Sequence, residues 1–267
     1  MSDTRSVYPI KHALARSASP DNPWFKRLNL CPRPRLRLFC FPYAGGSASV
    51  FRRWPAFFTE DIELIGVQYP GRAERYNETL IADCDQMVDA IYTHIPSLLD
   101  IPTVFFGHSN GGLIAYELAR KLQSASGYAL SHLFLSASRS AADRHVTTKR
   151  SALNDEALIR ELVSLNGTPP ALLEDQEMLA LYLPILRADF AIADNYRYCA
   201  TPCLKGNATV LYGLQDDSMS AADINGWQKI IDGTVDVIPI DGGHFFIHES
   251  LALVMSHVKH QLYGLPG

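Results

Sequence analysis

The sequence has few cysteines and no long hydrophobic run, and each shortage excludes a class of protein. No apolar stretch approaches the roughly 18–20 residues that a helix needs to cross a bilayer, so we expect no membrane-spanning segment. The N-terminus also lacks the apolar core of a signal peptide, which favours a cytoplasmic location. The cysteines are an odd and scattered set, which argues against a disulfide framework: Cys31, Cys40, Cys84, Cys199 and Cys203.

Motifs for metals, phosphates and nucleic acids are also missing. Cys199 and Cys203 are close in sequence, but no histidine or third cysteine lies beside them, so we expect two ordinary thiols and no metal site. The glycines at 45–46 do not belong to a G-x-x-x-x-G-K-[ST] pattern, which excludes a phosphate cradle of that type. Because no nucleic-acid motif accompanies the basic residues, we expect no nucleic-acid partner.

Charge is unevenly distributed along the 267 residues. The formal net charge is −4, but residues 1–37 contain eight Lys or Arg and two Asp or Glu, so they carry +6 and leave −10 for the remainder. The first 30 or so residues are rich in Ser, Pro and Asn and lack periodicity. We predict a flexible basic extension over residues 1–34, followed by a single domain over 35–267. A basic arm that meets an acidic partner is the alternative.

Apolar runs and helical patterns alternate over most of that domain. The spacing predicts amphipathic helices over residues 83–98 and 249–262, and the composition after Gly112 predicts a helix to about residue 123. This alternation is typical of an α/β protein with a mostly parallel central sheet flanked by helices. The predicted strands are residues 36–41, 63–67, 103–106, 132–136, 208–212 and 235–240.

The alternation is interrupted between about residues 139 and 202, where no strand pattern appears. Helical stretches are predicted there at 155–163, 175–183 and 185–194, and the prolines, Pro184 among them, are expected to separate them. We interpret this insertion as a helical cap, or lid, which would exclude water from an active site beneath it.

Two pairs of conspicuous side chains are expected to have structural roles. Phe51 and Trp54 follow the first strand and are expected to pack a helix against the core. Arg72 and Arg75 lie in the turn at 68–75, where Pro70-Gly71 favours a tight turn, and we expect both arginines to be solvated.

Residues 103–112 contain a G-x-S-x-G pattern between a predicted strand and a predicted helix. This context is typical of a nucleophile elbow, so we predict that Ser109 is the catalytic nucleophile. An oxyanion would then be stabilised by the backbone N–H of Asn110, the residue after the nucleophile. A second N–H is expected from the small-residue turn at 43–45, with that of Ala44 preferred.

A nucleophilic serine needs a base and an acid, and both follow it in the chain. In α/β-hydrolases these groups come in the order Ser, Asp or Glu, His, each after a strand. His244 follows the last predicted strand and is our candidate base, whereas the side chain of His108 should point away from Ser109. The acid is Asp216 or Asp217, in the turn after the strand at 208–212, with Asp216 preferred.

Several separate segments, in a fixed order along the chain, resemble those of a known family, and the resemblance extends from about Leu36 to Leu262. They resemble the type II (editing) thioesterases that accompany nonribosomal peptide and polyketide synthases. Asn110 departs from the family pattern, since methionine is usual after the nucleophile, and a polar side chain there is expected to alter the acyl pocket. The segments are FPYAGGS at 41–47, QYPGR at 68–72 with Glu74 and Arg75, GHS at 107–109, LPILRAD at 183–189 and GGHFF at 242–246.

The resemblance implies an α/β-hydrolase fold with a helical lid and a Ser-His-Asp mechanism. It further implies that the protein hydrolyses stalled or wrongly primed acyl groups from the phosphopantetheine thiol of carrier proteins. Carrier proteins would be its partners, and no cofactor or metal would be required.

Other functions remain open from the sequence. A small-molecule esterase or lipase shares the same three residues. A product-releasing thioesterase domain is normally fused to a synthase, and the chain shows no upstream carrier domain, which favours editing. A non-catalytic binding protein of this fold would usually have lost one of the three residues. We predict a monomer, because no oligomerisation segment is evident.

Overall fold

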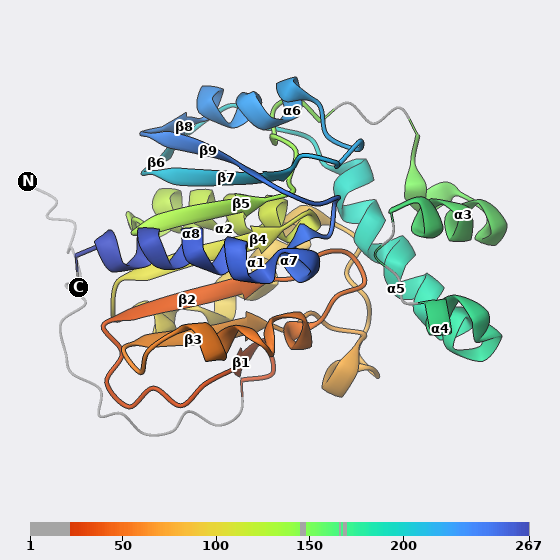
Figure 1. Cartoon of the computed structure of the whole chain (residues 1–267), viewed down its shortest axis with the longest axis horizontal. Helices are drawn as coiled ribbons and strands as arrows, with labels where there is room; N and C mark the ends of the chain where they lie inside the picture. Colours follow the sequence, from red (N-terminus) through yellow and green to blue (C-terminus); the bar gives the residue numbers. More distant parts are fainter. Residues whose placement is uncertain (1–21, 145–147, 166, 168–169, 267) are drawn as a thin grey trace, which may run out of the picture.

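The computed structural model describes residues 22–144, 148–165, 167 and 170–266, and a seven-stranded sheet passes through their centre (Figure 1). The spatial order of its strands is β1-β3-β2-β4-β5-β7-β9. Neighbouring strands are parallel, except that β1 runs antiparallel beside β3. The bounds are β1 Phe25–Arg27, β2 Leu36–Phe41, β3 Ile62–Val67, β4 Thr103–His108, β5 His132–Ser136, β7 Ala208–Gly213 and β9 Val235–Ile240.

All six predicted strands are present, and the predicted α/β class is confirmed. Three have the predicted bounds, and the other three begin or end one or two residues beyond them. Every residue of β2, β3, β4 and β5 is buried, as expected for parallel strands that are covered on both faces.

Helices cover both faces of the sheet (Figure 1). On one face, α1 (Cys84–His94) and α2 (Asn110–Ser126) bury an aliphatic cluster that includes Met87, Ile91 and Leu118. On the other face lie α7 (Phe246–Glu249) and α8 (Leu251–Gly264), with the 3-10 turns η1 (Ala48–Phe51) and η2 (Trp54–Phe57). Phe51 and Trp54 are buried against Phe106 there, so their predicted packing role is confirmed.

The remaining elements are short. They comprise the two-stranded parallel sheet of β6 (Leu204–Lys205) and β8 (Ile231–Asp232), the helix α6 (Ala221–Asn225), and the 3-10 turns η3 (Ala73–Arg75), η4 (Pro96–Leu98), η5 (Arg150–Ala152) and η6 (Gly226–Lys229). None of the helices in the described part of the chain is long and apolar enough to cross a membrane.

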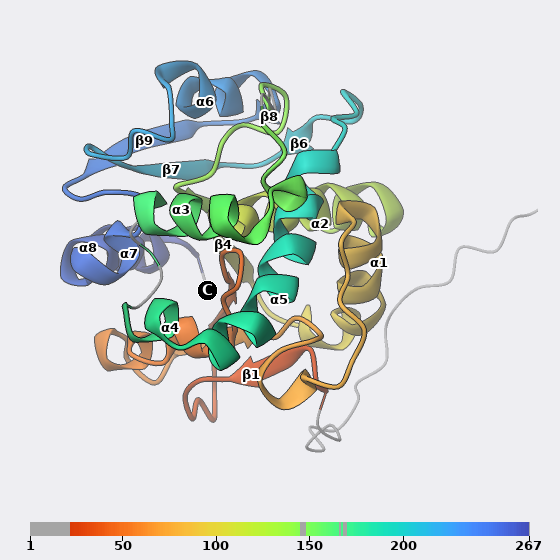
Figure 2. The ribbon, with the colours of Figure 1, turned by 90° about the vertical axis from the view of Figure 1, so that its right-hand side faces the viewer.

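Three helices between β5 and β6 form the lid: α3 (Asp155–Leu165), α4 (Pro170–Glu174) and α5 (Gln176–Asn195). Figure 2 shows them lying across the end of the sheet. They have a small apolar core of their own, separate from the two clusters of the sheet, because α3 and α5 each bury a leucine-rich face. Its buried members are Leu158, Leu162, Leu179, Leu183 and Leu186.

The predicted break at Pro184 is wrong, since this proline lies inside α5, which is one continuous helix of 20 residues. A proline inside a helix removes one backbone hydrogen bond and typically costs about 3 kcal/mol. Leu183, Ile185 and Leu186 are buried on either side of it, and their packing offsets that loss.

The predicted extension over residues 1–34 is also partly wrong. Residues 25–27 pair with the edge of the sheet as β1, and Trp24 and Phe25 are buried in the core. Three residues are too few to show a periodic pattern, so the sequence gives no signal for this strand. Residues 1–21 of the predicted extension lie outside the described residues.

A close backbone contact between β2 and α2 gives a first testable prediction. A Cβ atom on Gly111 would come closer than 3.0 Å to the backbone oxygens of Phe41 and Pro42. We predict that Gly111→Ala lowers the free energy of unfolding by about 1–3 kcal/mol, measured by denaturant titration. The control is Gly264→Ala at the end of α8, where an added methyl group meets no described atom within 4 Å. Equal stability of the two variants would contradict this prediction.

Candidate active site

Ser109 lies on a strained turn between β4 and α2. Its backbone has φ 54° and ψ −117°, a conformation that side-chain-bearing residues rarely adopt. The turn closes tightly, since a Cβ on Gly107 would overlap the backbone of Gly111. A hydrogen bond from the Ser109 N–H to the Ser136 carbonyl, 2.7 Å long, fixes the turn against β5. This geometry presents the serine hydroxyl at the carboxyl end of the central strand.

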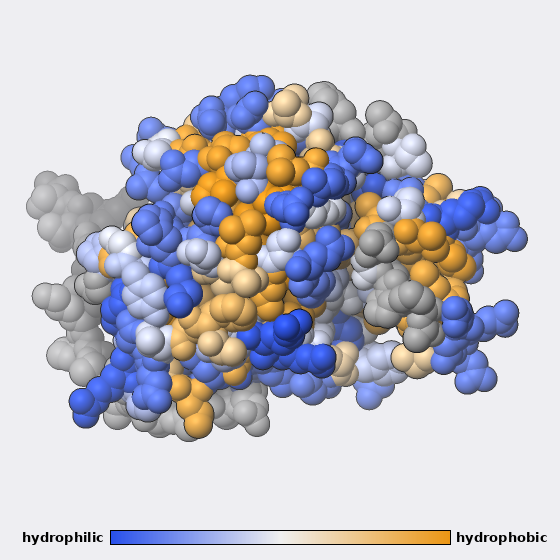
Figure 3. Space-filling view, viewed as in Figure 1, coloured by the Kyte–Doolittle hydropathy of each residue, from blue (hydrophilic) through white to orange (hydrophobic). Residues whose placement is uncertain are grey.

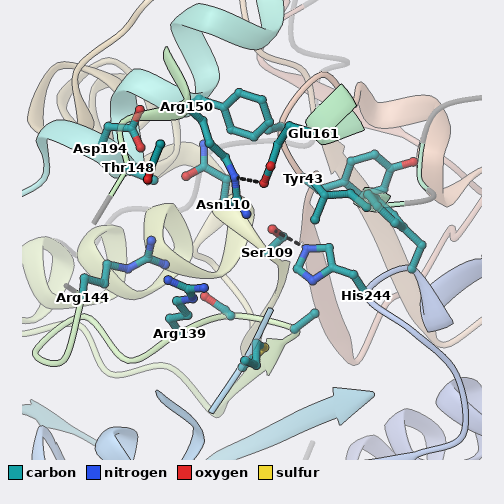
Figure 4. A pocket seen from close by; sticks show the side chains of 18 of the residues that line it. Tyr43, Ser109, Asn110, Arg139, Arg144, Thr148, Arg150, Glu161, Asp194 and His244 are labelled. Atoms are coloured by element: carbon teal, nitrogen blue, oxygen red, sulfur yellow. Dashed lines mark hydrogen bonds and ion pairs between the residues drawn. The ribbon is translucent and has the colours of Figure 1, made fainter. Parts of the chain in front are cut away.

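The structure brings Ser109, His244 and Asp216 into one hydrogen-bonded chain. His244 Nε2 lies 2.9 Å from Ser109 Oγ, the contact drawn in Figure 4, and His244 Nδ1 lies 2.7 Å from Asp216 Oδ2. Between the two acidic candidates, Asp216 is buried and reaches the histidine, whereas Asp217 is exposed.

The Asp216 carboxylate is held in its ionised form. Ser218 donates to Asp216 Oδ1 through both its N–H, at 3.0 Å, and its hydroxyl, at 2.5 Å. Burial by itself raises the pKa of Asp216, but hydrogen bonds from His244 and Ser218, together with the charge of His244, hold the pKa below its ordinary value. An ionised acceptor at this point fixes the Nδ1–H tautomer of His244, which leaves Nε2 free to accept a proton from Ser109.

His108 supports the site from behind. It is fully buried, with Nδ1 2.9 Å from Ser136 Oγ and Nε2 3.0 Å from the backbone oxygen of His244. Burial, with the nearby histidines His244 and His248, keeps its pKa well below the ordinary value, so the ring is neutral. The side chain therefore positions the loop that carries His244, and its two ring nitrogens contact Ser136 and that loop rather than the Ser109 hydroxyl.

The two expected oxyanion donors line the same cavity as Ser109. Asn110 is the first residue of α2, and N–H groups in the first turn of a helix have no acceptor within the helix. Ala44 lies in the turn after β2, and no hydrogen bond within the described residues uses its N–H. Both donors therefore remain available to a ligand oxygen.

The expectation that Arg72 is solvated is wrong. Arg72 is 4% exposed and forms a bidentate ion pair with Asp189 of α5, which is 1% exposed. Burial by itself lowers the pKa of Arg72, but the Asp189 charge and hydrogen bonds raise it above the ordinary value. The sequence could not pair these residues, because they are 117 positions apart and each lies in a segment with its own local pattern.

Asp189 also connects the lid to both oxyanion segments. Its Oδ2 accepts a hydrogen bond from the Gly45 N–H at 2.7 Å, and its backbone oxygen accepts one from Asn110 Nδ2 at 2.9 Å. The lid helix thereby fixes the turn that carries Ala44 and the first residue of α2.

Arg75 is buried too, contrary to the expectation of a solvated side chain. Its guanidinium stacks over the Trp24 ring with a distance of 4.0 Å to the centroid, and its Nη1 donates to the Gln68 carbonyl at 2.8 Å. Arg75 also pairs with Glu78. This arginine therefore packs the turn after β3 against the residue that precedes β1.

A cavity of about 360 Å³ opens above Ser109 and is roofed by the lid (Figure 4). Residues from α3 and α5 line it, among them Glu161, Leu165 and Phe190. Arg139, Arg144 and Arg150 also line it, and the sequence analysis identified none of these three. Within the described residues, no group of three or more His, Cys, Asp or Glu side chains could hold a metal ion.

These features define the α/β-hydrolase class. The sheet is mostly parallel, and a serine lies on the turn after its central strand. That serine is hydrogen-bonded to a histidine, which is hydrogen-bonded in turn to a buried aspartate. The family comparison narrows the class, since the Thioesterase domain family matches residues 36–262. The chain belongs to this family and is a hydrolase of thioesters.

Individual relatives agree with this assignment. The chain is 38% identical to the gramicidin S biosynthesis protein GrsT of Aneurinibacillus migulanus over 86% of this chain and 90% of the relative. Among solved structures, the type II thioesterase BorB of the borrelidin biosynthetic cluster superposes with a TM-score of 0.84 at 29% identity, covering 91% and 99% of the two chains. YbtT, the type II thioesterase of the yersiniabactin pathway, gives 0.80 at 28% identity over 91% and 100%.

The Arg72–Asp189 pair gives a prediction that separates stability from activity. We expect Arg72→Met to lower the free energy of unfolding by about 3–5 kcal/mol, because it leaves the Asp189 charge buried and unpaired. The double variant Arg72→Met/Asp189→Leu should recover most of that stability. Its kcat for thioester hydrolysis should stay low, because the Gly45 N–H loses its acceptor. Thermal unfolding and steady-state kinetics measure the two effects.

Arg160→Met provides the control, since Arg160 is exposed on α3 and pairs only loosely with Glu156 at 3.9 Å. Its stability and kcat should match those of the wild type. Full recovery of kcat in the double variant would show that the buried pair does not position the turn.

Proposed function

We propose that this protein is a type II editing thioesterase, which releases stalled or wrongly primed acyl groups from carrier proteins of a nonribosomal peptide or polyketide assembly line. The observation that carries the proposal is the hydrogen-bonded chain of Ser109, His244 and Asp216 in a lidded cavity. The names of the relatives support it, because BorB and YbtT are both described as type II thioesterases, and YbtT as one of a nonribosomal peptide and polyketide pathway.

In the proposed first half-reaction, Ser109 Oγ attacks the thioester carbonyl carbon while His244 Nε2 takes the hydroxyl proton. The oxyanion is held by the N–H groups of Ala44 and Asn110. The carbon–sulfur bond then breaks, and the phosphopantetheine thiol leaves with the proton from His244. The acyl group remains on Ser109 as an ester.

In the second half-reaction, His244 takes a proton from a water molecule as the water oxygen attacks the acyl-enzyme. The same two N–H groups hold the second oxyanion. When the ester bond breaks, His244 returns the proton to Ser109 and the free acid leaves. Asp216 stays ionised throughout and stabilises the imidazolium. These steps balance without a cofactor or a metal, and the proposal includes neither.

The proposed partners are carrier proteins that present the acylated phosphopantetheine arm, and the proposed acting form is a monomer. The lid offers a surface for such a partner. Val163, Met178 and Leu181, on α3 and α5, are each more than half exposed. Figure 3 shows hydrophobic side chains gathered on the visible face of the lid. Exposed apolar patches of this kind are typical of protein contact sites.

The carrier-protein proposal is tested by comparing one acyl group on two leaving groups. We predict that acetyl is released from a loaded carrier protein at least about tenfold faster, in kcat/KM, than from a simple acetyl ester. Ser109→Ala and His244→Ala should each lower kcat by about 10³-fold or more, with unchanged thermal unfolding. Equal or better activity on the ester would make the protein a general esterase and would remove the carrier protein from the proposal.

The choice of acid gives a second prediction with a matched control in the neighbouring residue. We expect Asp216→Asn to lower kcat by about 10³–10⁴-fold, because an amide at this position favours the wrong tautomer of His244. Asp217→Asn makes the same chemical change one residue later on an exposed side chain, and kcat should stay within about twofold. Similar losses in both variants would contradict the assignment of Asp216.

A further inference from the structure

The cavity beside Ser109 contains a concentration of unpaired buried polar atoms. Among the described residues, four buried side-chain nitrogen or oxygen atoms have no hydrogen-bond partner. Three of them belong to residues that line this cavity: Asn110 Oδ1, Ser138 Oγ and Arg144 Nε. Buried polar groups are normally hydrogen-bonded, and an unpaired one is costly. Three of the four unpaired atoms thus belong to residues around one cavity, which makes this cavity the first place to look for a polar ligand.

Of these three residues only Arg144 is charged, and a charged group is the most costly to leave without a partner. Two carboxylates line the same cavity, and each accepts a hydrogen bond from a group other than Arg144. Glu161 Oε1 accepts from Arg150 Nε at 2.7 Å, and Asp194 Oδ2 accepts from the Ser151 N–H at 2.8 Å. No ion pair between Arg144 and a carboxylate is found within the described residues.

A second guanidinium, that of Arg139, lines the same cavity and adds to its positive charge. Arg139 Nε donates to the Ser218 carbonyl at 3.1 Å, which holds its charge near the site. Burial lowers the pKa of Arg144 to about 10, and the like charge of Arg139 acts in the same direction. Asp223 opposes the shift only weakly, and its carboxylate already caps α6 through the Ser220 N–H at 2.8 Å. Among the described residues, neither guanidinium forms an ion pair with a carboxylate, and this arrangement favours the binding of an anion.

The chemistry of a guanidinium selects the kind of anion. Arginine presents paired N–H donors in a planar fork that matches a carboxylate or a phosphate. The substrate of the proposed function offers an anionic group in two places. A dicarboxylic acyl chain carries a carboxylate close to the thioester, and the phosphopantetheine arm carries a phosphodiester at its opposite end, next to the carrier protein. Because Arg144 shares one cavity with Ser109, the acyl carboxylate is the better placed of the two.

We propose that Arg144, with Arg139 beside it, binds a carboxylate at the far end of the acyl chain, so that dicarboxylic acyl groups are a preferred substrate class of this thioesterase. The inference rests on the proposed function and specifies which acyl groups the cavity accepts. Asn110 and Ser138 line the same cavity. Arg144 is thus a specificity-determining residue with no part in bond breaking.

The experiment compares acyl groups that differ only in a terminal carboxylate. Malonyl is paired with propionyl, and glutaryl with pentanoyl, each as the N-acetylcysteamine thioester and as the phosphopantetheine thioester, with spontaneous hydrolysis subtracted. We expect wild-type kcat/KM to be about tenfold higher for the dicarboxylic member of each pair. Arg144→Gln should abolish that preference and leave the monocarboxylic thioesters within about twofold, whereas Arg160→Gln, on the exposed face of α3, should retain it.

A measurement on the wild type alone keeps the proposal testable if Arg144→Gln does not fold. Glutarate should inhibit hydrolysis of the propionyl thioester at least about tenfold more strongly than pentanoate. Equal inhibition, or equal kcat/KM within both acyl pairs, would overturn the proposal.

Comparing the N-acetylcysteamine and phosphopantetheine thioesters shows whether Arg144 binds the acyl carboxylate or the phosphate of the arm. If Arg144→Gln slows all acyl groups on phosphopantetheine and none on N-acetylcysteamine, the arginine binds the phosphate of the arm and the acyl-carboxylate assignment is wrong. The proposed function fails in a different way, namely if the wild type hydrolyses none of these thioesters.

Discussion

The buried ion pair between Arg72 and Asp189 is the interaction on which the rest of the site depends. Asp189 belongs to the lid helix α5, yet it contacts the turn after β3 through Arg72, the turn after β2 through Gly45 and the start of α2 through Asn110. Two charges that are almost completely buried are tolerable only when both are paired and their other hydrogen bonds are satisfied. The pair therefore ties the position of the lid to that of the oxyanion donors, which pure apolar packing would not do.

The residues predicted from the sequence are those whose signal is local in the chain. Ser109 sits in a glycine pattern between a strand and a helix, and both His244 and the turn with the two candidate acids follow a strand. Chain order is therefore enough to select the serine, the histidine and that turn. Local signals could not separate Asp216 from Asp217 decisively, because both lie in one turn. Burial separates them in the structure, where only Asp216 faces His244. The Arg72–Asp189 pair has no local signal, although the segments that contain its two members both resemble the family.

The errors in the predicted fold have one physical origin, namely tertiary packing that overrides local preference. Pro184 reads as a helix break, but buried neighbours on both sides keep α5 continuous. Residues 25–27 show no strand pattern, but the free edge of β3 pairs with them, and the ring of Trp24 receives Arg75. In each case the decisive contact joins segments distant in the chain. The central strands are predictable from the local sequence, because strands of a parallel sheet are continuous apolar runs.

Arg72 and Arg144 show how the same guanidinium group can serve either the fold or the recognition of a substrate. Arg72 has its carboxylate inside the fold, so its charge contributes to a fixed arrangement that is complete before any substrate arrives. Arg144 lines the cavity with its Nε buried and unpaired among the described residues. A fold that neutralises one buried guanidinium with a well-formed bidentate pair could neutralise another in the same way. The proposed carboxylate site rests on this difference, since Arg144 lines the cavity of Ser109 and forms no ion pair with a carboxylate among the described residues.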